Sequence, residues 1–596
     1  MRQTARRLRV IFRVCFRADA RIASLALVLS IIGNVAGPLS ALWLKSLVDA
    51  ATAGDQTAAV SAAIGLAASW AVSMLAGHAS TYVAYALEIR VIRLVLFEVM
   101  EMSGRVPTIE MQERPDVADR IRMIRNRDAK PFAFAMTSTV WAVGMVTRLT
   151  TTVLVLISVS PVLVLLPLLG IPSLVAGAWA QRLRQRVRED TVEDDRLSDH
   201  LAWLVTKPES GKELRIFGLA SEITGRYEAL RSSIQVRERR AEVRAAFATS
   251  VGWLLYAVGY AGAIVLVTLM AIDGRATAGD VLLVIDLAAQ IQIQLDGAVT
   301  LIGEFIQTLR AADHYLWLRD LTDQVGARRE PTASVPVRLS DSIRFEGVSF
   351  RYPDTDADVL RDIDLTIPAG TALAIVGVNG AGKTTLAKLL AGFYEPTEGR
   401  ITVDGSDMRD LDLNEWRRRM SACFQDFMHF EYVAHESVGL GDLPRIDDQP
   451  SVEEAVRRAN AADVIEALPD GLGTLLGREY GDGVELSTGQ WQKVALGRAM
   501  MREDPLLLIL DEPTASLDAY TEHAMFERYA QASQRAGGEL GAITVLISHR
   551  FSTVRMADMV VVLEAGRIVQ KGTHAELEHE HGAYRELYEL QSRAYR

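Results

Sequence analysis

Eight residues decide the fold of the second half of this 596-residue chain: Gly377-Val-Asn-Gly380-Ala-Gly382-Lys383-Thr384. They match the pattern of a glycine-rich phosphate-binding loop, with an apolar strand predicted over 372–376 before them and a helix over 385–391 after them. Glycines let backbone N–H groups approach phosphates, and a helix N-terminus favours negative charge. We therefore predict that Lys383 reaches the β- and γ-phosphates of a nucleotide and that Thr384 holds Mg²⁺. The other predicted nucleotide contacts are Gly377, Asn379, Gly380 and Gly382 in this stretch and Thr385 directly after it.

A second, acidic motif lies downstream, where the apolar run 506–510 ends in Asp511 and Glu512. An apolar run that ends in two acids suits a buried strand whose end faces the nucleotide. Asp511 is then predicted to support Mg²⁺, and Glu512 to orient or deprotonate the attacking water. Such runs are common by themselves, but downstream of a phosphate-binding loop the pattern becomes specific for a nucleotide site.

Further motifs, in a fixed order, make the sequence resemble the ATP-binding cassette (ABC) family. The stretch Leu486-Ser487-Thr488-Gly489-Gln490 resembles the signature motif that defines this family. Four other positions match family motifs. Tyr352 matches the aromatic residue that stacks on adenine, and Gln425 matches the glutamine that contacts Mg²⁺ and water. Asp518, in Ser516-Leu517-Asp518, matches the loop after the catalytic glutamate, and His549 matches the switch histidine. Each is weak alone, but together and in order they are specific.

The resemblance implies a mechanism with two cassettes. In this family the cassettes dimerise head to tail, and each ATP, with its Mg²⁺, lies between the phosphate loop of one and the signature motif of the other. Ser487, Gly489 and Gln490 would then act on the partner's nucleotide, while Glu512, His549 and Gln425 would serve hydrolysis. Since the chain holds one cassette, its expected partner is a second ABC half-transporter, in a homodimer or a heterodimer.

One position departs from the family pattern. The signature usually has glycine where this chain has Thr488. A side chain there adds bulk near the partner's γ-phosphate, but Ser487 and Gly489 remain, so we expect a mild effect. A heterodimer with two unequal ATP sites stays open, although Glu512 and His549 argue against an inactive site on this chain.

The first half of the chain predicts membrane spans. Hydrophobic residues make up 49% of the sequence and charged residues 23%, which is unusual for a soluble enzyme of this length. Six apolar runs, each near or above the roughly 20 residues that cross a bilayer, lie at 23–47, 58–84, 135–159, 162–180, 247–272 and 279–302. Six buried core helices of a soluble protein are the alternative, and hydropathy disfavours it.

Before the first run, an amphipathic segment with Leu8, Ile11, Phe12 and Cys15 on one face predicts a helix in the membrane interface, in contact with lipids, rather than a basic cytosolic tail.

Arginine placement predicts the orientation. The segments 88–130 and 182–244 and the N-terminal segment are rich in arginine, whereas the connections 49–57, 158–161 and 273–278 are nearly free of basic residues. The positive-inside rule then places both termini and everything after the last span in the cytosol, where ATP is.

The membrane half resembles that of family exporters, which fuse six spans to a C-terminal cassette. The expected fold is therefore an all-α six-helix transmembrane domain at 1–325, a linker at 326–340 and an α/β P-loop cassette at 341–596. In exporters two cytosolic turns dock on the cassettes, and the candidates here are 111–119 and 210–219, of which the second resembles that element more closely.

Polar groups recur within the last span. Asp286, Gln290 and Gln294 are spaced by four residues and share a helical face. Polar residues inside a span face a cavity or a partner, so this face is predicted either to touch the transported molecule or to hydrogen-bond across the dimer.

The leading functional prediction is ATP-driven export of a small molecule, peptide or lipid, in the plasma membrane of a bacterium. The alternative is an ABC-type membrane ATPase that gates a channel or regulates a partner.

The net charge of -11 and the lack of a sustained basic surface outside the span-flanking segments predict no nucleic-acid partner. Cys15 and Cys423 have no metal-binding spacing and fit a reducing compartment. The sequence does not choose the substrate.

Overall fold

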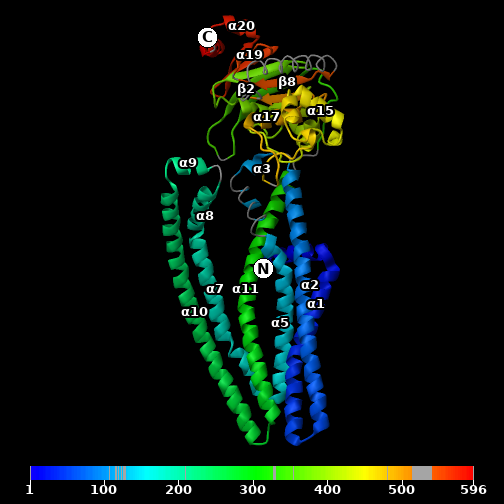
Figure 1. The fold of residues 1–596 in the computed structure, drawn as a ribbon, viewed down its shortest axis with the longest axis vertical. Coiled ribbons are helices and arrows are strands. Elements are labelled where there is room, and N and C mark those ends of the chain that lie inside the picture. The colour runs from blue at the N-terminus through cyan, green and yellow to red at the C-terminus, as the bar shows by residue number, and fades with distance from the viewer. Residues whose placement is uncertain are drawn as a thin grey trace. The chain divides into compact units, whose positions relative to one another are not determined.

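The computed structural model describes residues 2–594 apart from 107, 115–116, 118–119, 122–123, 125–128, 208–209, 327–330, 354, 480, 513–539 and 549. It consists of two compact units (Figure 1). The first comprises Met1–Ser103 and Arg120–Leu321, and the second Gly104–Asp119 and Thr322–Arg596. The predicted linker 326–340 remains a prediction, and its residues 327–330 lie outside the described part of the chain.

The first unit is built from long helices. They are α1 (Arg2–Ala53), α2 (Gln56–Arg105), α5 (Ala129–Val159), η2 (Pro161–Val164), α6 (Leu165–Leu168), α7 (Ile171–Asp190), α8 (Val192–Thr206), α9 (Gly211–Ile216), α10 (Ala220–Ile272) and α11 (Ala278–Gly326). Within the described residues, six segments are long and apolar enough to cross a membrane: Arg6–Ala53, Gln56–Arg105, Phe134–Val159, Pro161–Asp190, Ala220–Ile272 and Ala278–Asp323. The predicted six-helix transmembrane fold is confirmed.

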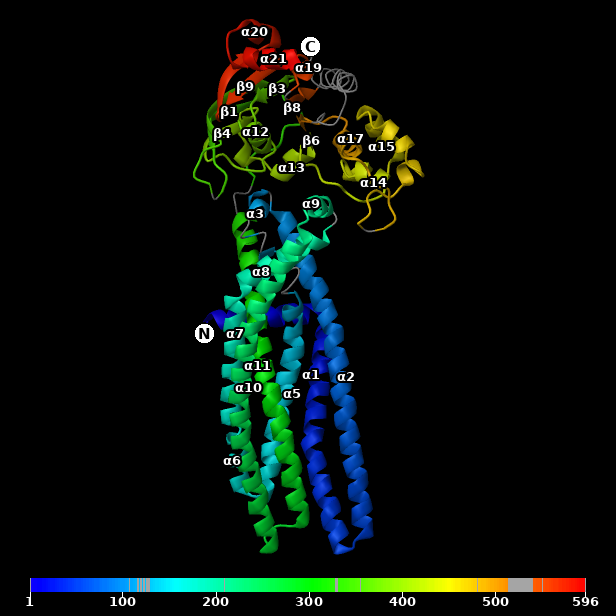
Figure 2. The same cartoon turned by 60° about the vertical axis from the view of Figure 1, so that its left-hand side comes forward.

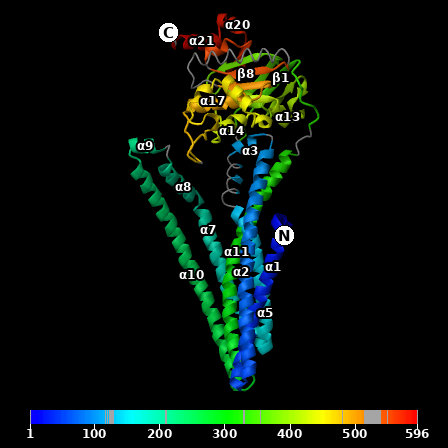
Figure 3. The same ribbon diagram turned by 45° about the vertical axis from the view of Figure 1, so that its right-hand side comes forward.

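The helices of this unit extend beyond the predicted apolar runs. In Figure 3, α8 and the first part of α10 lie apart from α2, while the other ends of the long helices converge. Polar contacts join α1 to α11 near the short connections. Lys45 pairs with Asp280 at 2.6 Å, and Asp49 accepts hydrogen bonds from the Thr277 hydroxyl and the Gly279 N–H. These contacts fix the end of the first span against the start of the last.

Asp19 separates the N-terminal amphipathic segment from the first span. Its backbone is extended, and its Oδ1 accepts the N–H groups of Arg21 and Ile22 at 3.0 Å, as an N-cap does for a new helix. The buried face of the preceding segment is formed by Val10, Ile11, Val14 and Cys15. Phe12, predicted to share a helical face with Ile11 and Cys15, is 37% exposed. Contact of this segment with lipids stays a prediction.

The second unit contains two sheets. The four-stranded antiparallel sheet has the order β2 (Leu360–Pro368), β1 (Ser342–Phe350), β4 (Glu398–Val403), β5 (Ser406–Asp407). The six-stranded sheet has the order β10 (Arg567–Gly572), β9 (Met559–Glu564), β3 (Ala372–Gly377), β8 (Ile543–Ile547), β7 (Leu507–Asp511), β6 (Met420–Cys423). All neighbours in it pair in parallel except β10 and β9. Continuous apolar runs suit such strands because both faces of a parallel sheet are buried.

Helices complete this unit. Those beside the sheets are α12 (Lys383–Leu390), α13 (Leu413–Arg418), α19 (Phe551–Val554), α20 (His574–His579) and α21 (Ala583–Ala594). A separate group, to one side of the sheets in Figure 2, comprises α14 (Ala434–Gly439), α15 (Gln449–Arg458), α16 (Ala462–Glu466) and α17 (Thr488–Ala499). This group has its own apolar core around the buried Trp491. The predicted α/β cassette is confirmed.

The short helix α3 (Glu110–Glu113) belongs to the cassette's unit although it precedes most of the membrane helices in sequence. The Ile109 N–H donates to the Phe393 carbonyl at 3.2 Å, Lys388 pairs with Glu113 at 2.8 Å, and the Tyr394 hydroxyl donates to the same carboxylate. The prediction that 111–119 contacts the cassette is confirmed at Glu113, while residues 115–116 and 118–119 lie outside the described part. Docking of the other turn, which contains α9, stays a prediction.

Candidate nucleotide-binding site

Parallel pairing brings the predicted site residues to one edge of the six-stranded sheet. β3, β8, β7 and β6 run in the same direction, so their carboxyl ends meet there. The phosphate loop follows β3, Asp511 ends β7 and Gln425 follows β6 by two residues. Motifs far apart in sequence therefore converge on one site.

The phosphate loop has a backbone that its glycines make possible. Gly377 has φ 154°, and a Cβ there would lie 2.2 Å from the Leu563 carbonyl oxygen. Gly382, at φ 102°, caps α12 in a left-handed conformation. Asn379 and Gly380 are exposed at the tip of the loop. The loop can therefore wrap around a ligand while α12 directs its N-terminus at it.

Lys383 is held inside this loop. Its ammonium donates to the carbonyls of Gly377 at 2.9 Å and Val378 at 3.2 Å, and the residue is 8% exposed. Burial lowers the pKa of Lys383, and the nearby Glu512 and Asp511 oppose that shift. A buried cation whose partners are neutral carbonyls is poised to exchange them for phosphate oxygens, which are stronger acceptors.

Asp511 and Thr384 form a pair suited to a hard cation. The Thr384 hydroxyl donates to Asp511 Oδ2 at 2.8 Å. Among the described residues, Oδ1 of this 1%-exposed carboxylate has no hydrogen-bond partner. Burial raises the pKa of Asp511 to about 6, although the Thr384 hydrogen bond lowers it. A buried, unpaired carboxylate oxygen beside a hydroxyl fits Mg²⁺, which prefers oxygen ligands and keeps several waters.

Glu512 follows β7 in a conformation that few residues other than glycine adopt. Its φ is 48°, and its N–H donates to the Ile547 carbonyl at 2.9 Å. The Gln492 side chain, from α17, donates to the Glu512 carbonyl at 3.1 Å. Left-handed backbone at a non-glycine residue costs energy and clusters at functional sites. Gln492 thus ties the helix that carries the signature motif to the predicted catalytic acid, a contact that the sequence pattern did not predict.

The signature motif forms the N-terminus of α17. Ser487 accepts the Gln490 N–H at 3.3 Å, and the Gln490 amide oxygen accepts the Ser487 N–H at 2.8 Å, which completes a capping box. The Gln490 side chain, predicted to contact the nucleotide, is engaged in this cap. Ser487 and Thr488 are exposed, so both are accessible from outside this chain.

Tyr352 lies beside the phosphate-loop helix. Its hydroxyl is 3.0 Å from the Thr385 hydroxyl, and its ring meets Phe350 and Tyr394 edge to face. Gln425 is exposed. Asp518 and His549 lie outside the described residues, so their predicted roles, like those of the other site residues, stay predictions.

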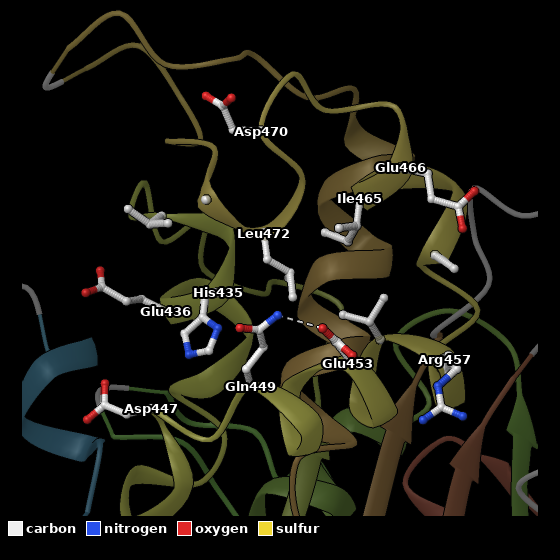
Figure 4. A pocket seen from close by; sticks show the side chains of 14 residues that line it. His435, Glu436, Asp447, Gln449, Glu453, Arg457, Ile465, Glu466, Asp470 and Leu472 are labelled. Carbon is white, nitrogen blue, oxygen red and sulfur yellow. Dashed lines mark hydrogen bonds between the residues drawn. The ribbon is translucent and has the colours of Figure 1, made fainter.

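A cavity of about 760 Å³ lies elsewhere in the cassette, between α14, α15 and α16 (Figure 4). Its charged lining is mostly acidic: Glu436, Asp447, Glu453, Glu466 and Asp470, against Arg457 and His435. Along α15, Gln449 donates to Glu453 at 2.8 Å. A triphosphate would be repelled here, so this cavity is not a candidate nucleotide site.

Comparisons with known proteins agree with both units. The model of the ABC transporter family matches residues 360–515, and that of the ABC transporter transmembrane region matches residues 24–295. An ATP-dependent lipid A-core flippase of Chromohalobacter salexigens is 37% identical over 347 residues, which cover 58% of this chain and 57% of the relative. The flippase of Bordetella avium is 32% identical over 464 residues, covering 76% and 75%.

Two further similarities concern other proteins. An uncharacterized ABC transporter ATP-binding protein, YfiC of Bacillus subtilis, is 30% identical over 458 residues, or 76% of this chain and 73% of the relative. The solved structure of a bacterial Atm1-family ABC exporter with ATP bound matches with a TM-score of 0.77 over 96% of this chain and 97% of that one. At 24% identity, the latter similarity concerns the fold.

Proposed function

Because the chain belongs to the ABC transporter family, and is therefore an ATPase coupled to membrane transport, we propose that it is one half of a dimeric exporter. One observation carries this proposal: Lys383, the Thr384–Asp511 pair and Glu512 meet at one sheet edge. Within its described residues, the same chain has six segments long and apolar enough to cross a membrane. The catalytic and the translocating parts thus belong to a single polypeptide.

The proposed roles combine this geometry with the family motifs in the sequence. Lys383 and the loop N–H groups bind the phosphates of ATP, and Tyr352 stacks on the adenine. Thr384, Asp511 and Gln425 hold Mg²⁺, which when bound neutralises phosphate charge. Glu512 positions the attacking water and accepts its proton, and His549 and Asp518 complete the site.

Two cassettes are proposed to share each ATP. Ser487 and Gly489 would bind the nucleotide held by the partner's phosphate loop, which fits the exposure of the signature motif. The partner is a second copy or a related half-transporter. The cassette and both termini are proposed to lie in the cytosol, which the arginine-rich segments support, and the bacterial relatives fit a location in the plasma membrane.

The exported molecule is proposed to be a small molecule, a peptide or a lipid. The relatives named lipid A-core flippases favour an amphipathic lipid-like substrate. A channel or regulator is the second candidate, and the Glu512 site, built for turnover, disfavours it.

The test uses the purified protein in sealed vesicles with the cassettes outside. Export predicts that ATP drives substrate into the vesicles and that Glu512→Gln stops this accumulation. A nucleotide-gated ion current without accumulation would support the channel and contradict export.

A further inference from the structure

A cation and an anion lie within the membrane unit with one amide between them. Arg148, on α5, donates from Nη2 to the Gln290 Oε1 at 3.0 Å, and Gln290, on α11, donates from Nε2 to Asp286 Oδ2 at 2.7 Å. We name these three residues the Arg148–Asp286 cluster. All three are half-buried, and α5 and α11 lie beside one another in Figures 1 and 2. The sequence prediction covered Gln290 and Asp286 but not Arg148, which interrupts an apolar span.

The amide orientation follows from its neighbours. A carboxamide has an acceptor end and a donor end, and only its oxygen can face a guanidinium while its nitrogen faces a carboxylate. Gln290 therefore separates two opposite charges that could otherwise close into a direct ion pair. Charges within a membrane span are costly unless they are paired or face a cavity, and Arg148 and Asp286 are held apart with part of each side chain accessible.

Hydrogen-bonding capacity beside the cluster is left unused. Gln294 lies one helical turn from Gln290 and is 8% exposed, yet neither its oxygen nor its nitrogen has a hydrogen-bond partner among the described residues. Arg148 Nε likewise has no hydrogen-bond partner among the described residues. Across from it, Gly37 of α1 has no side chain, and a Cβ there would lie 3.5 Å from Arg148 Nη2. A network that served packing alone would be expected to satisfy its buried groups, because an unsatisfied one is costly.

We propose that the Arg148–Asp286 cluster, with Gln294, binds the zwitterionic group of the transported molecule, an ammonium and an oxyacid anion in one compound. This inference rests on the proposed export function and names its substrate class. The cluster has one positive and one negative side chain, so a simple anion would be repelled by Asp286 and a simple cation by Arg148. A zwitterion presents its anion to Arg148 and its ammonium to Asp286, and the Gln294 amide supplies a further donor and acceptor.

Two kinds of molecule carry this chemistry, a soluble peptide-like compound and a phospholipid with an ethanolamine headgroup. The test measures ATPase stimulation of the full-length protein in nanodiscs. One arm adds triglycine, its cationic amide or its anionic N-acetyl derivative to discs of phosphatidylglycerol. The other arm compares discs with and without phosphatidylethanolamine. The wild type is expected to prefer the zwitterion in one arm, which identifies the source.

Two variants test whether the charges of the Arg148–Asp286 cluster determine this preference. Arg148→Gln leaves Asp286 and should shift the preference toward the cationic amide, whereas Asp286→Asn leaves Arg148 and should shift it toward the anionic derivative. Each shift is expected to be about tenfold in the ratio of half-saturating concentrations, since hydrogen bonds to charged groups are the strong ones. The ratio is taken within one variant, so a loss of folded protein does not affect it. In the lipid arm, the same variants should lose the phosphatidylethanolamine effect.

The matched control is the exposed Arg275–Asp273 pair, at 3.2 Å in the connection between α10 and α11. Arg275→Gln and Asp273→Asn remove the same charges and should keep the wild-type ranking. The proposal is overturned if the wild type prefers no zwitterion in either arm. It is also overturned if the cluster variants lower thermal stability but leave the ranking unchanged, which would indicate helix–helix bonding. Failure of export itself would instead appear as the absence of ATP-driven accumulation of any substrate, with cluster-dependent ATPase stimulation intact.

Discussion

The nucleotide site and the Arg148–Asp286 cluster are built in different ways. In the cassette, Lys383, Thr384 and Glu512 sit on backbone that local sequence dictates, in a glycine loop and at the end of a buried strand. In the membrane unit, Arg148 and Gln290 are 142 positions apart and meet only because two long helices pack together. The cassette site is therefore fixed locally, while the cluster depends on tertiary packing.

This difference separates two kinds of functional effect. Changes in the cassette should act on ATP binding and turnover whatever substrate is present. Changes in the cluster should alter which substrate stimulates turnover. A cluster variant that weakened ATP binding, or a cassette variant that changed the substrate preference, would contradict this division.

The largest effect is expected from Glu512→Gln. The substitution keeps the size of the side chain but removes the group that accepts a proton from water, so ATP turnover should fall about a thousandfold. ATP affinity should stay near the wild-type value, as measured by equilibrium binding of radiolabelled ATP. Wild-type hydrolysis in this variant would remove Glu512 from the proposed mechanism.

Lys383→Ala should affect binding before turnover. The variant lacks the buried ammonium that is proposed to contact the phosphates, so nucleotide affinity should fall roughly 10- to 100-fold. Fluorescent ATP titration measures this, with Lys493→Ala as a control, since Lys493 pairs with Asp463 away from the loop. Unchanged affinity in Lys383→Ala would contradict the assignment of the phosphate loop.

Much of the cassette could be predicted from sequence because its motifs carry their own structural context. The strand before Gly377, the helix after Lys383 and the strand ending in Asp511 all lie within one or two residues of their predicted ranges. The contact between Gln492 and the Glu512 carbonyl could not be predicted from the sequence, because it joins α17 to the end of β7 through the tertiary fold.

In the membrane half, apolar length predicted the six spans. It could not predict that Arg148 meets Gln290, because hydropathy contains no information on which helices are neighbours.

A third prediction concerns pH. Burial raises the pKa of Asp511 to about 6, so the carboxylate is ionised above that pH and protonated below it. A protonated carboxyl does not bind Mg²⁺, and the Mg²⁺ affinity of the nucleotide complex should therefore fall about tenfold from pH 7 to pH 5. The nucleotide itself titrates in this range. For that reason the measured quantity is the ratio of Mg²⁺ half-saturation between wild type and Asp511→Asn, and a ratio independent of pH would contradict the proposed role.

Glu113→Gln tests the segment that crosses the division, because residues 104–119 come from the first half of the chain but pack with the cassette. The variant weakens the contacts with Lys388 and Tyr394, and hydrogen exchange of the α3 amides should accelerate about fivefold. Glu110→Gln, which removes the same charge from the same helix, should change exchange less. Equal effects of the two variants would mean that the Glu113 contacts do not hold the segment in place.

The smallest effect is expected from Thr488→Gly, which restores the usual signature residue. The capping box of Ser487 and Gln490 does not use the Thr488 side chain, so α17 should keep its N-terminus. Relief of bulk near the partner's nucleotide should change turnover by less than about twofold, because the backbone already fixes the motif. Ser487→Ala, which removes both the cap and the hydroxyl, is the reference and should cost more. The comparison is made by ATPase assay at saturating Mg²⁺–ATP. If Thr488→Gly changed turnover tenfold or more, the side chain of Thr488 would itself be a functional part of the site. The cassette would then depend on a residue outside the family pattern.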